Sequence, residues 1–324
     1  MSAKFTVWIL WFIICLGFRI YNLEFEKSMP ELPEVQTIVD DLNRKIRGKT
    51  VVDFLTDWPK TIKYPVLKFR KEIVGKKILN IQRRGKNLLF FLDNGKVMLV
   101  HLKMTGHLLV KSSQSINQKA GKDYFSDKVN QYIHHIWHLR EKTGGKAGVI
   151  LEFSDLRKFG KIMLIDKDEI EKVKDISALG PDPLSGEFTL AKLKEVLLKK
   201  KNIPIRNILM DQSLIAGIGN IYVSEILFDA GVSPKSSAKD VLKNGQKAGR
   251  LFKSIKKILK KAVKLRGTSD SDYRDTNGAP GGFQLFLKVY RKEGRPCPRQ
   301  GCTGVIRREK AAGRSSFWCP KCQR

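Results

Sequence analysis

A proline followed by two glutamates is the part of this sequence best suited to covalent chemistry. Residues 29–35 have the sequence MPELPEV. If translation starts at Met29 and this methionine is removed, Pro30 carries a free secondary amine. Its pKa of about 8 leaves roughly a tenth of the amine unprotonated near pH 7. Such an amine can attack an electrophilic carbon and form an iminium ion, which promotes elimination. Glu31 and Glu34 could donate and accept the protons.

The same stretch also has the features of a helix start. Pro33 suits the first helical position, and Glu34 would lie favourably in the first turn. Gly48 stands where a helix-terminating glycine belongs. The apolar residues between them recur at helical spacing, namely Val35, Ile38, Val39, Leu42 and Ile46. The two interpretations are compatible, because a helix beginning at Pro33 would fix the amine and both acids at its own N-terminus.

Four cysteines near the C-terminus predict a metal site. They form two pairs, Cys297-x4-Cys302 and Cys319-x2-Cys322, separated by a stretch with hairpin character. Four thiolates in this pattern suit one tetrahedral, structural Zn²⁺ in a β-hairpin finger. The alternative is two disulfides. Apart from Cys15, near the N-terminus, the chain has no other cysteine.

The formal charge of +30 predicts a polyanionic partner. Because the basic residues are spread along the chain, we expect a folded protein with a basic face. Nucleic acid is the first candidate for the partner, and an anionic membrane surface is the second.

Residues 1–28 differ from the rest. Phe5 to Phe18 is almost continuously apolar, which is short for a membrane span and near the length of a signal-peptide core. As an anchor it would bury the Pro30 nitrogen in a peptide bond and abolish the nucleophile. The interpretation favoured here is an over-extended reading frame with the true start at Met29. A removed segment and a genuine anchored, inactive form are the alternatives.

The region from Thr50 to Asp166 is mostly strand in character. Asp93-Asn94-Gly95 supplies a hairpin turn. Several short strands flanked by the first helix predict a β-sandwich. The strands are expected at 51–55, 77–82, 88–92, 97–102, 108–111, 148–153 and 161–165.

Between these strands, residues 112–147 are expected to form a surface loop. His134, His135 and His138 lie close together in it. Histidines at i and i+4 can ligate a metal, but no acid or cysteine is nearby, so the loop interpretation is favoured.

The remainder of the chain predicts helices. Residues 167–186 are acidic and then rich in Pro and Gly, as in a linker. Two short helices follow, and then Gly217 and Gly219 precede an apolar helix. Their exposed amides at a helix N-terminus are typical of a phosphate-binding place. A single basic helix is expected over 238–265, and the composition of residues 266–282 is typical of a disordered linker.

From Met29 to the C-terminus these motifs resemble the formamidopyrimidine-DNA glycosylases, bacterial base-excision repair enzymes. The similarity rests on PELPEVQT at 30–37, DLRKFG at 155–160, the 211–225 stretch and the finger. It implies an α+β fold: an N-terminal β-sandwich flanked by helices, then a helical domain with a helix-two-turns-helix motif and a zinc β-hairpin finger. The implied divisions are a doubtful extension (1–28), a catalytic domain (29–166), a linker (167–186), a helical DNA-binding domain with a lesion-capping loop (187–282) and a zinc finger (283–324).

The resemblance also implies roles for individual residues. Pro30 would attack C1′ of the flipped nucleotide, Glu31 would protonate the sugar ring oxygen, and Glu34 would support the site. Lys86, otherwise interpreted as a surface lysine, would contact the phosphate near the lesion. The remaining DNA contacts would come from His101, the wedges Met104 and Phe159, Arg157 on the orphaned cytosine, Asn220 on the backbone, and Arg314 on a phosphate.

The expected function is removal of oxidised purines such as 8-oxoguanine from duplex DNA, with strand cleavage by β- and δ-elimination. The expected protein is a cytoplasmic monomer, with no membrane partner if translation starts at Met29. The alternatives are the sister activity on oxidised pyrimidines and a non-catalytic, zinc-dependent DNA-binding protein. Lesion ranking, opposite-base preference, the start codon and the form of residues 112–147 do not follow from the sequence.

Overall fold

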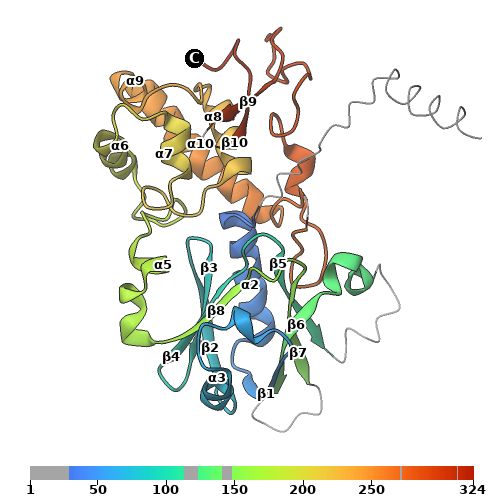
Figure 1. Cartoon of the computed structure of the whole chain (residues 1–324). Coiled ribbons are helices and arrows are strands. Elements are labelled where there is room, and N and C mark those ends of the chain that lie inside the picture. Colours follow the sequence, from blue (N-terminus) through green and yellow to red (C-terminus); the bar gives the residue numbers. More distant parts are fainter. Residues whose placement is uncertain (1–28, 113–122, 141–147, 271, 312) are drawn as a thin grey trace, which may run out of the picture.

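The computed structural model describes residues 29–112, 123–140, 148–270, 272–311 and 313–324. Within them the chain forms two halves stacked on each other, strands below and helices above (Figure 1). The expected α+β class is therefore confirmed. Residues 1–28, with the expected start-site extension, lie outside the described residues.

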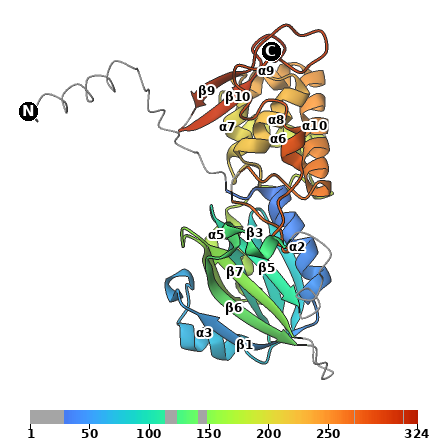
Figure 2. The ribbon, with the colours of Figure 1, turned by 90° about the vertical axis from the view of Figure 1, so that its right-hand side faces the viewer.

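The first helix, α2, joins the two halves. It spans Leu32–Ile46, and its apolar face is buried, with Val35, Ile38 and Leu42 fully inaccessible. The chain then turns at Gly48, whose φ is +84°. The helix packs against strands of the lower half and against α10 (Gly245–Lys264) of the upper half, so residues at its N-terminus reach the junction (Figure 2).

The lower half is a sandwich of two antiparallel four-stranded sheets. Their strand orders are β1-β6-β7-β5 and β2-β3-β4-β8. Alternate side chains from the two sheets and from α2 form one apolar core. The elements of this half are β1 (Thr50–Thr56), η1 (Pro59–Thr61), α3 (Val66–Ile73), β2 (Ile78–Arg84), β3 (Asn87–Leu92), β4 (Lys96–His101), β5 (Gly106–Ser112), η2 (Tyr124–Ser126), η3 (Lys128–Asn130), β6 (Ile133–Arg140), β7 (Val149–Asp155) and β8 (Lys161–Asp166).

The expected surface loop over 112–147 is wrong for residues 133–140. These residues form β6, which pairs with both β1 and β7. His135 is fully buried and stacks between Phe54 and Phe153, with ring centroids 6.1 and 5.7 Å away. His134 instead contacts Asp57, with Nδ1 2.9 Å from Oδ1. The histidines are therefore sheet residues, and the described ones form no metal cluster with one another.

The segment after β8 is packed against the lower half. It contains η4 (Lys167–Lys172) and α5 (Lys174–Ser177). Ile170 and Ile176 are buried against Leu89, Val97 and Leu99 of the second sheet.

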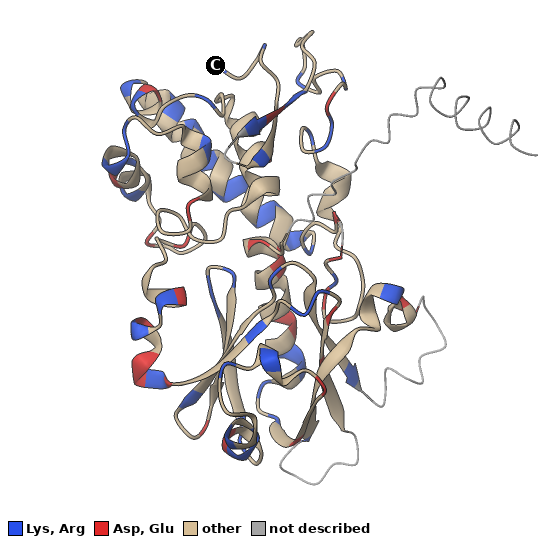
Figure 3. Ribbon diagram, viewed as in Figure 1, with Lys and Arg blue, Asp and Glu red and all other residues tan. Residues whose placement is uncertain are grey.

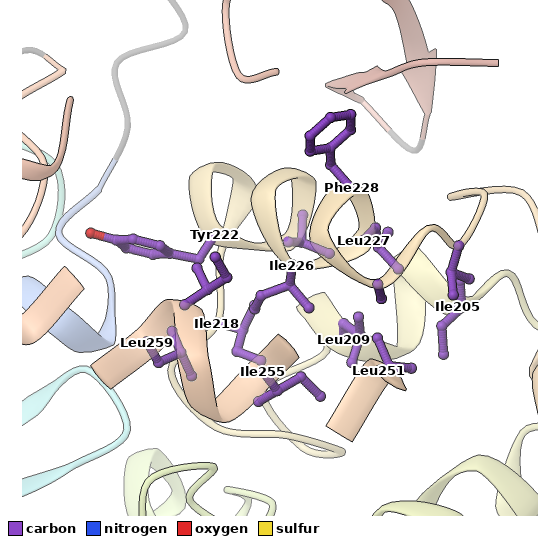
Figure 4. Packing of buried hydrophobic residues seen from close by; sticks show 14 of the residues in the cluster. Ile205, Leu209, Ile218, Tyr222, Ile226, Leu227, Phe228, Leu251, Ile255 and Leu259 are labelled. Atoms are coloured by element: carbon purple, nitrogen blue, oxygen red, sulfur yellow. The ribbon is translucent and has the colours of Figure 1, made fainter. Parts of the chain in front are cut away.

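The upper half is a helical bundle with its own core (Figure 4). The sequence predicts one helix over 238–265, which is wrong because Asn244 interrupts it. The Asn244 side chain accepts hydrogen bonds from the amides of Gln246 and Lys247 (3.1 and 3.2 Å) and so caps a new helix. The helices are α6 (Leu190–Lys199), α7 (Ile205–Met210), α8 (Asn220–Ala230), α9 (Ala238–Lys243), α10 and the short η5 (Phe283–Phe286).

The chain ends in a two-stranded hairpin of β9 (Arg307–Ala311) and β10 (Arg314–Trp318). Phe317 and Cys319 join the helical core, so the hairpin is attached to the bundle. Lys and Arg residues occur along the chain in both halves and in this hairpin (Figure 3). Among the described residues, no helix has the length and apolar character needed to span a membrane.

Candidate active site and nucleic-acid interface

The Glu31 carboxylate lies at the N-terminus of α8. It accepts hydrogen bonds from the amides of Gly219 (2.8 Å) and Ile221 (2.9 Å), and a longer one from Tyr222 (3.4 Å). A Cβ on Gly219 would lie 2.4 Å from the Glu31 carboxyl carbon, so only glycine fits there. The amides expected to bind phosphate therefore bind a carboxylate of the protein itself, for the same electrostatic reason.

Glu34 is enclosed by donors from three segments. Its carboxylate accepts hydrogen bonds from the Tyr222 hydroxyl (2.5 Å), the Thr268 amide (2.6 Å) and the Glu31 amide (2.9 Å). Figure 4 shows the Tyr222 ring leaving the apolar cluster of the upper half with its hydroxyl turned away from it. Thr268 belongs to the 266–282 segment, so this segment touches the acids of α2.

Burial governs the protonation of this cluster. Desolvation raises the pKa of Glu31 to about 7, against the opposing effect of the Lys86 ammonium. Burial also raises the pKa of Glu34 and lowers the pKa of Lys86. A carboxyl group with a pKa near 7 can hold a proton at neutral pH and deliver it, as a general acid must.

Pro30 is buried directly before these acids, and Met29 is partly exposed. The helix start therefore fixes the proline and both glutamates in one place, as the sequence predicts.

Lys86 lies in the turn between β2 and β3, beside Gly85, whose φ is +59°. It is only 9% exposed, so its interpretation as a surface lysine is wrong. Besides burial, the charges of Glu31, Arg314 and Glu34 perturb its pKa, which places all three near its ammonium. Arg314 is the exposed first residue of β10. The structure thus brings together four residues that are spread along the sequence from position 31 to position 314.

The two expected wedges lie on neighbouring loops and are linked by Arg157. Its Nη1 lies 3.2 Å from the Met104 sulfur, and its guanidinium lies 4.6 Å from the Phe159 ring centroid. Phe159 is 52% exposed rather than part of the core. The Asp155 carboxylate holds this loop by accepting from the Gly160 amide (2.7 Å). An exposed apolar ring on a loop fixed in this way can enter a base stack.

His101 is the last residue of β4, and Asn220 is the first residue of α8. The His101 Nδ1 accepts from the Lys103 amide (3.0 Å), and burial lowers its pKa to about 3, so the ring is neutral. The Asn220 Oδ1 accepts from Arg206 (2.7 Å), and Arg206 also donates to the Ser315 carbonyl (3.2 Å). Arg206 therefore connects α7, the start of α8 and the finger hairpin.

The four C-terminal cysteines form a compact group of free thiols. Their sulfurs all lie within 4.8 Å of one another, with 3.7 Å between Cys297 and Cys322 and 3.8 Å between Cys302 and Cys319. Zn–S bonds of about 2.3 Å directed to the corners of a tetrahedron place neighbouring sulfurs about 3.8 Å apart. The residues therefore fit one metal ion, and the alternative of two disulfides does not fit.

Sequence reasoning missed Tyr222 and Arg206. Tyr222 lies within an apolar helix and resembles a core residue in the sequence. Arg206 is 2% exposed, although its charge predicts a surface position. Only an aligned set of relatives could have singled them out.

Comparison with known proteins agrees with this geometry. The profile of the formamidopyrimidine-DNA glycosylase N-terminal domain matches residues 29–162, and that of the formamidopyrimidine-DNA glycosylase H2TH domain matches residues 179–273. A formamidopyrimidine-DNA glycosylase of Carboxydothermus hydrogenoformans is 41% identical over 297 residues, covering 91% of this chain and 100% of the relative.

Solved structures give the same result. The complex of MutM with DNA containing carbocyclic 8-oxo-G has a TM-score of 0.75 at 31% identity, covering 91% of this chain and 100% of that one. A Lactococcus lactis Fpg variant in complex with DNA containing Fapy-dG has a TM-score of 0.76 at 31% identity, with the same coverage. Together with the buried acids beside Pro30, these matches establish that the chain belongs to the formamidopyrimidine-DNA glycosylase family of base-excision repair enzymes.

Proposed function

We propose that this glycosylase removes oxidised purines, including 8-oxoguanine and formamidopyrimidines, from duplex DNA and then cleaves the strand. The observation that carries the proposal is the pair of buried carboxylates fixed directly after Pro30, with Lys86 beside them. The similar structures that hold DNA with 8-oxo-G and Fapy-dG support the choice of lesion.

In the proposed reaction, the Pro30 nitrogen attacks C1′ of the flipped nucleotide and the bond from C1′ to the damaged base breaks. Glu31 gives its proton to the ring oxygen, which opens the sugar and leaves an iminium ion between C1′ and Pro30. Loss of a proton from C2′, which the iminium ion acidifies, then breaks the C3′–O bond by β-elimination, and loss of a proton from C4′ breaks the C5′–O bond by δ-elimination, so both phosphates leave with the electron pairs of those bonds. Water finally releases Pro30.

The other residues bind DNA. Lys86, His101, Asn220 and Arg314 would hold the phosphates around the lesion. Met104 and Phe159 would fill the gap left by the flipped nucleotide, and Arg157 would bond the orphaned cytosine.

The four-cysteine group would hold one Zn²⁺. The metal would link the two cysteine pairs of the finger and would take no part in the reaction. Cys297, Cys302, Cys319 and Cys322 would bind it, and thereby fix the hairpin that presents Arg314.

This chemistry requires a free Pro30 amine. The family profile begins at residue 29, and relatives covered over their full length match 91% of this chain, which supports a catalytic form that starts at Met29. We propose that this form is a monomer that acts on DNA in the cytoplasm.

Borohydride trapping tests the proposal. Protein expressed from Met29 is incubated with duplex DNA containing 8-oxoguanine opposite cytosine, and the adduct is mapped by mass spectrometry. We expect a covalent adduct at Pro30. Protein that retains residues 1–28, in which the Pro30 nitrogen lies in a peptide bond, serves as a control for adducts at lysines.

Tight binding with no adduct would refute the Pro30 mechanism and favour a non-catalytic DNA-binding protein. An adduct on thymine glycol but none on 8-oxoguanine would favour the sister activity on oxidised pyrimidines. An adduct formed equally well by protein that retains residues 1–28 would place the nucleophile elsewhere.

A further inference from the structure

The 266–282 segment belongs to the upper half but is attached to the lower half. The Val110 amide on edge strand β5 donates to the Thr276 carbonyl (2.9 Å), which continues the sheet by one bond. The Thr276 hydroxyl donates to Asp41 of α2 (2.9 Å). Asp41 also forms an ion pair with Arg266, at the start of the segment (2.5 Å). The segment is thus held on two sides by conventional contacts with α2 and β5.

A third attachment comes from residues 123–130, which form the turn η2–η3 and precede β6. Asp127 Oδ2 accepts from Arg274 Nε (3.2 Å) and Nη2 (2.9 Å), and the Arg274 side chain is only 13% exposed. The Asn130 side chain is 2% exposed, and its amide donates to the carbonyls of Tyr124 (2.6 Å) and Gly278 (3.2 Å). The sequence predicts only a surface loop for these residues.

The fit at this contact is close. Gly278 has φ of +75°, and a Cβ there would lie 2.7 Å from Asn130 Nδ2 and 3.1 Å from the Tyr124 carbonyl oxygen. Asp127 is fixed by its own turn, because its other carboxylate oxygen accepts from the Val129 amide (3.3 Å). The turn therefore presents an amide and a carboxylate at positions set by its backbone.

The other end of the segment lies at the acids. Thr268 donates its amide to Glu34 and its hydroxyl lies 3.0 Å from that of Tyr222. Arg274 also donates through Nη1 to the carbonyl of Tyr273 (2.9 Å). Because Asp127 holds the Arg274 guanidinium, the ion pair also fixes the backbone at Tyr273, which lies between Thr268 and the 274–278 contacts.

We propose that the 123–130 turn is a positioning element for base recognition: Asp127 and Asn130 hold residues 274–278 so that Thr268, beside Glu34, and Tyr273 lie next to a flipped base. The inference rests on the proposed glycosylase function. An abasic nucleotide has no base to cover, so cleavage at a preformed abasic site should not depend on the turn. This difference separates positioning from a general effect on folding.

A charge exchange tests the ion pair. We expect Asp127→Arg, and separately Arg274→Asp, to lower the single-turnover rate of 8-oxoguanine release about tenfold, within the usual range for coupled neighbours. Cleavage of the same duplex carrying an abasic site should be unchanged. The double variant, which restores an opposite-charge pair, should recover most of the lost rate. Gln131→Ala is the matched control, because its amide bonds the Phe125 carbonyl (2.7 Å) within the turn and does not reach the 266–282 segment.

Amide hydrogen exchange gives a readout independent of activity. Asp127→Arg should increase exchange at residues 274–278, and the double variant should restore protection. The proposal is overturned if the single variants slow both reactions equally, if neither reaction changes, or if exchange at 274–278 is unaffected. If the wild type cleaves abasic DNA but releases no 8-oxoguanine, the proposed substrate fails and the exchange experiment still decides the role of the turn.

Discussion

Acid should destabilise this protein through histidines buried in its lower half, and His135 is the clearest case. Its ring is inaccessible and stacked between two phenylalanines, and burial lowers its pKa to about 4. In the unfolded chain the same imidazole has a pKa of about 6.5. The folded-state pKa is therefore depressed. Its contribution to stability is complete above pH 6.5 and is lost as the pH falls towards 4.

The size of the effect follows from the two pKa values. At pH 5 the unfolded imidazole is almost fully protonated and the folded one almost neutral, which costs about 2 kcal/mol relative to pH 8. His107, whose pKa burial lowers to about 4, and His101, lowered to about 3, should each add a similar amount. The sum of about 6 kcal/mol is comparable to the whole stability of many domains, which is roughly 5–15 kcal/mol.

His135→Phe isolates one contribution. A phenyl ring can occupy the slot between Phe54 and Phe153, where the centroid separations are 6.1 and 5.7 Å. The free energy of unfolding would be measured by urea denaturation at pH 5, 6, 7 and 8. We expect the variant to lose about 2 kcal/mol less than the wild type between pH 8 and pH 5. Loss of metal from the finger at acid pH would change the free energy of unfolding of both proteins equally, so it cancels in the difference between them. If both proteins lose stability in parallel, the ring is not a buried neutral group and the reasoning is refuted.

Three further outcomes are expected. Cys319→Ser should release zinc and weaken DNA binding, as measured by metal analysis and titration, and undiminished binding would contradict a role for the finger. Tyr222→Phe should cost roughly 1–3 kcal/mol in urea denaturation because the buried Glu34 carboxylate loses a donor, and an unchanged midpoint would show that this bond contributes nothing. DNA affinity should fall steeply with salt, in proportion to the phosphates neutralised, and a flat response would argue against the basic face.

Local patterns predicted much of the fold. The spacing of Val35, Ile38 and Leu42 predicted α2, and runs of β-branched or apolar residues predicted seven of the eight strands in the sandwich. The eighth, β6, was missed because its inward-facing residues include His135, a polar type that does not signal burial. The break at Asn244 was missed because the apolar spacing continues across it and the capping bond is a local competitor to helix propagation.

The candidate site was predictable only in part. Pro30, Glu31 and Glu34 are neighbours in the sequence, and the cysteine spacing indicates its own geometry. The family resemblance placed Lys86 and Arg314 in the same site as these residues. The periodicity of the sequence could not have predicted this, because both residues are far from Pro30 along the chain. The contact of Glu31 with the amides at the start of α8 joins residues that are 188 to 191 positions apart. The glycines before α8 predicted that these amides bind an anion, but they did not indicate that the anion is the Glu31 carboxylate.

The Glu31 contact with α8 makes the chemistry conditional on assembly. During synthesis the lower half leaves the ribosome first, with both glutamates solvated and their pKa values near those of free side chains. Only when α8 has been made and docked is Glu31 enclosed, and this burial raises its pKa although the hydrogen bonds from the α8 amides act in the opposite direction. An incomplete chain can therefore hold the proline and both acids and still lack a proton donor at neutral pH. The proposed strand cleavage would thus be withheld until the helical half of the protein is in place.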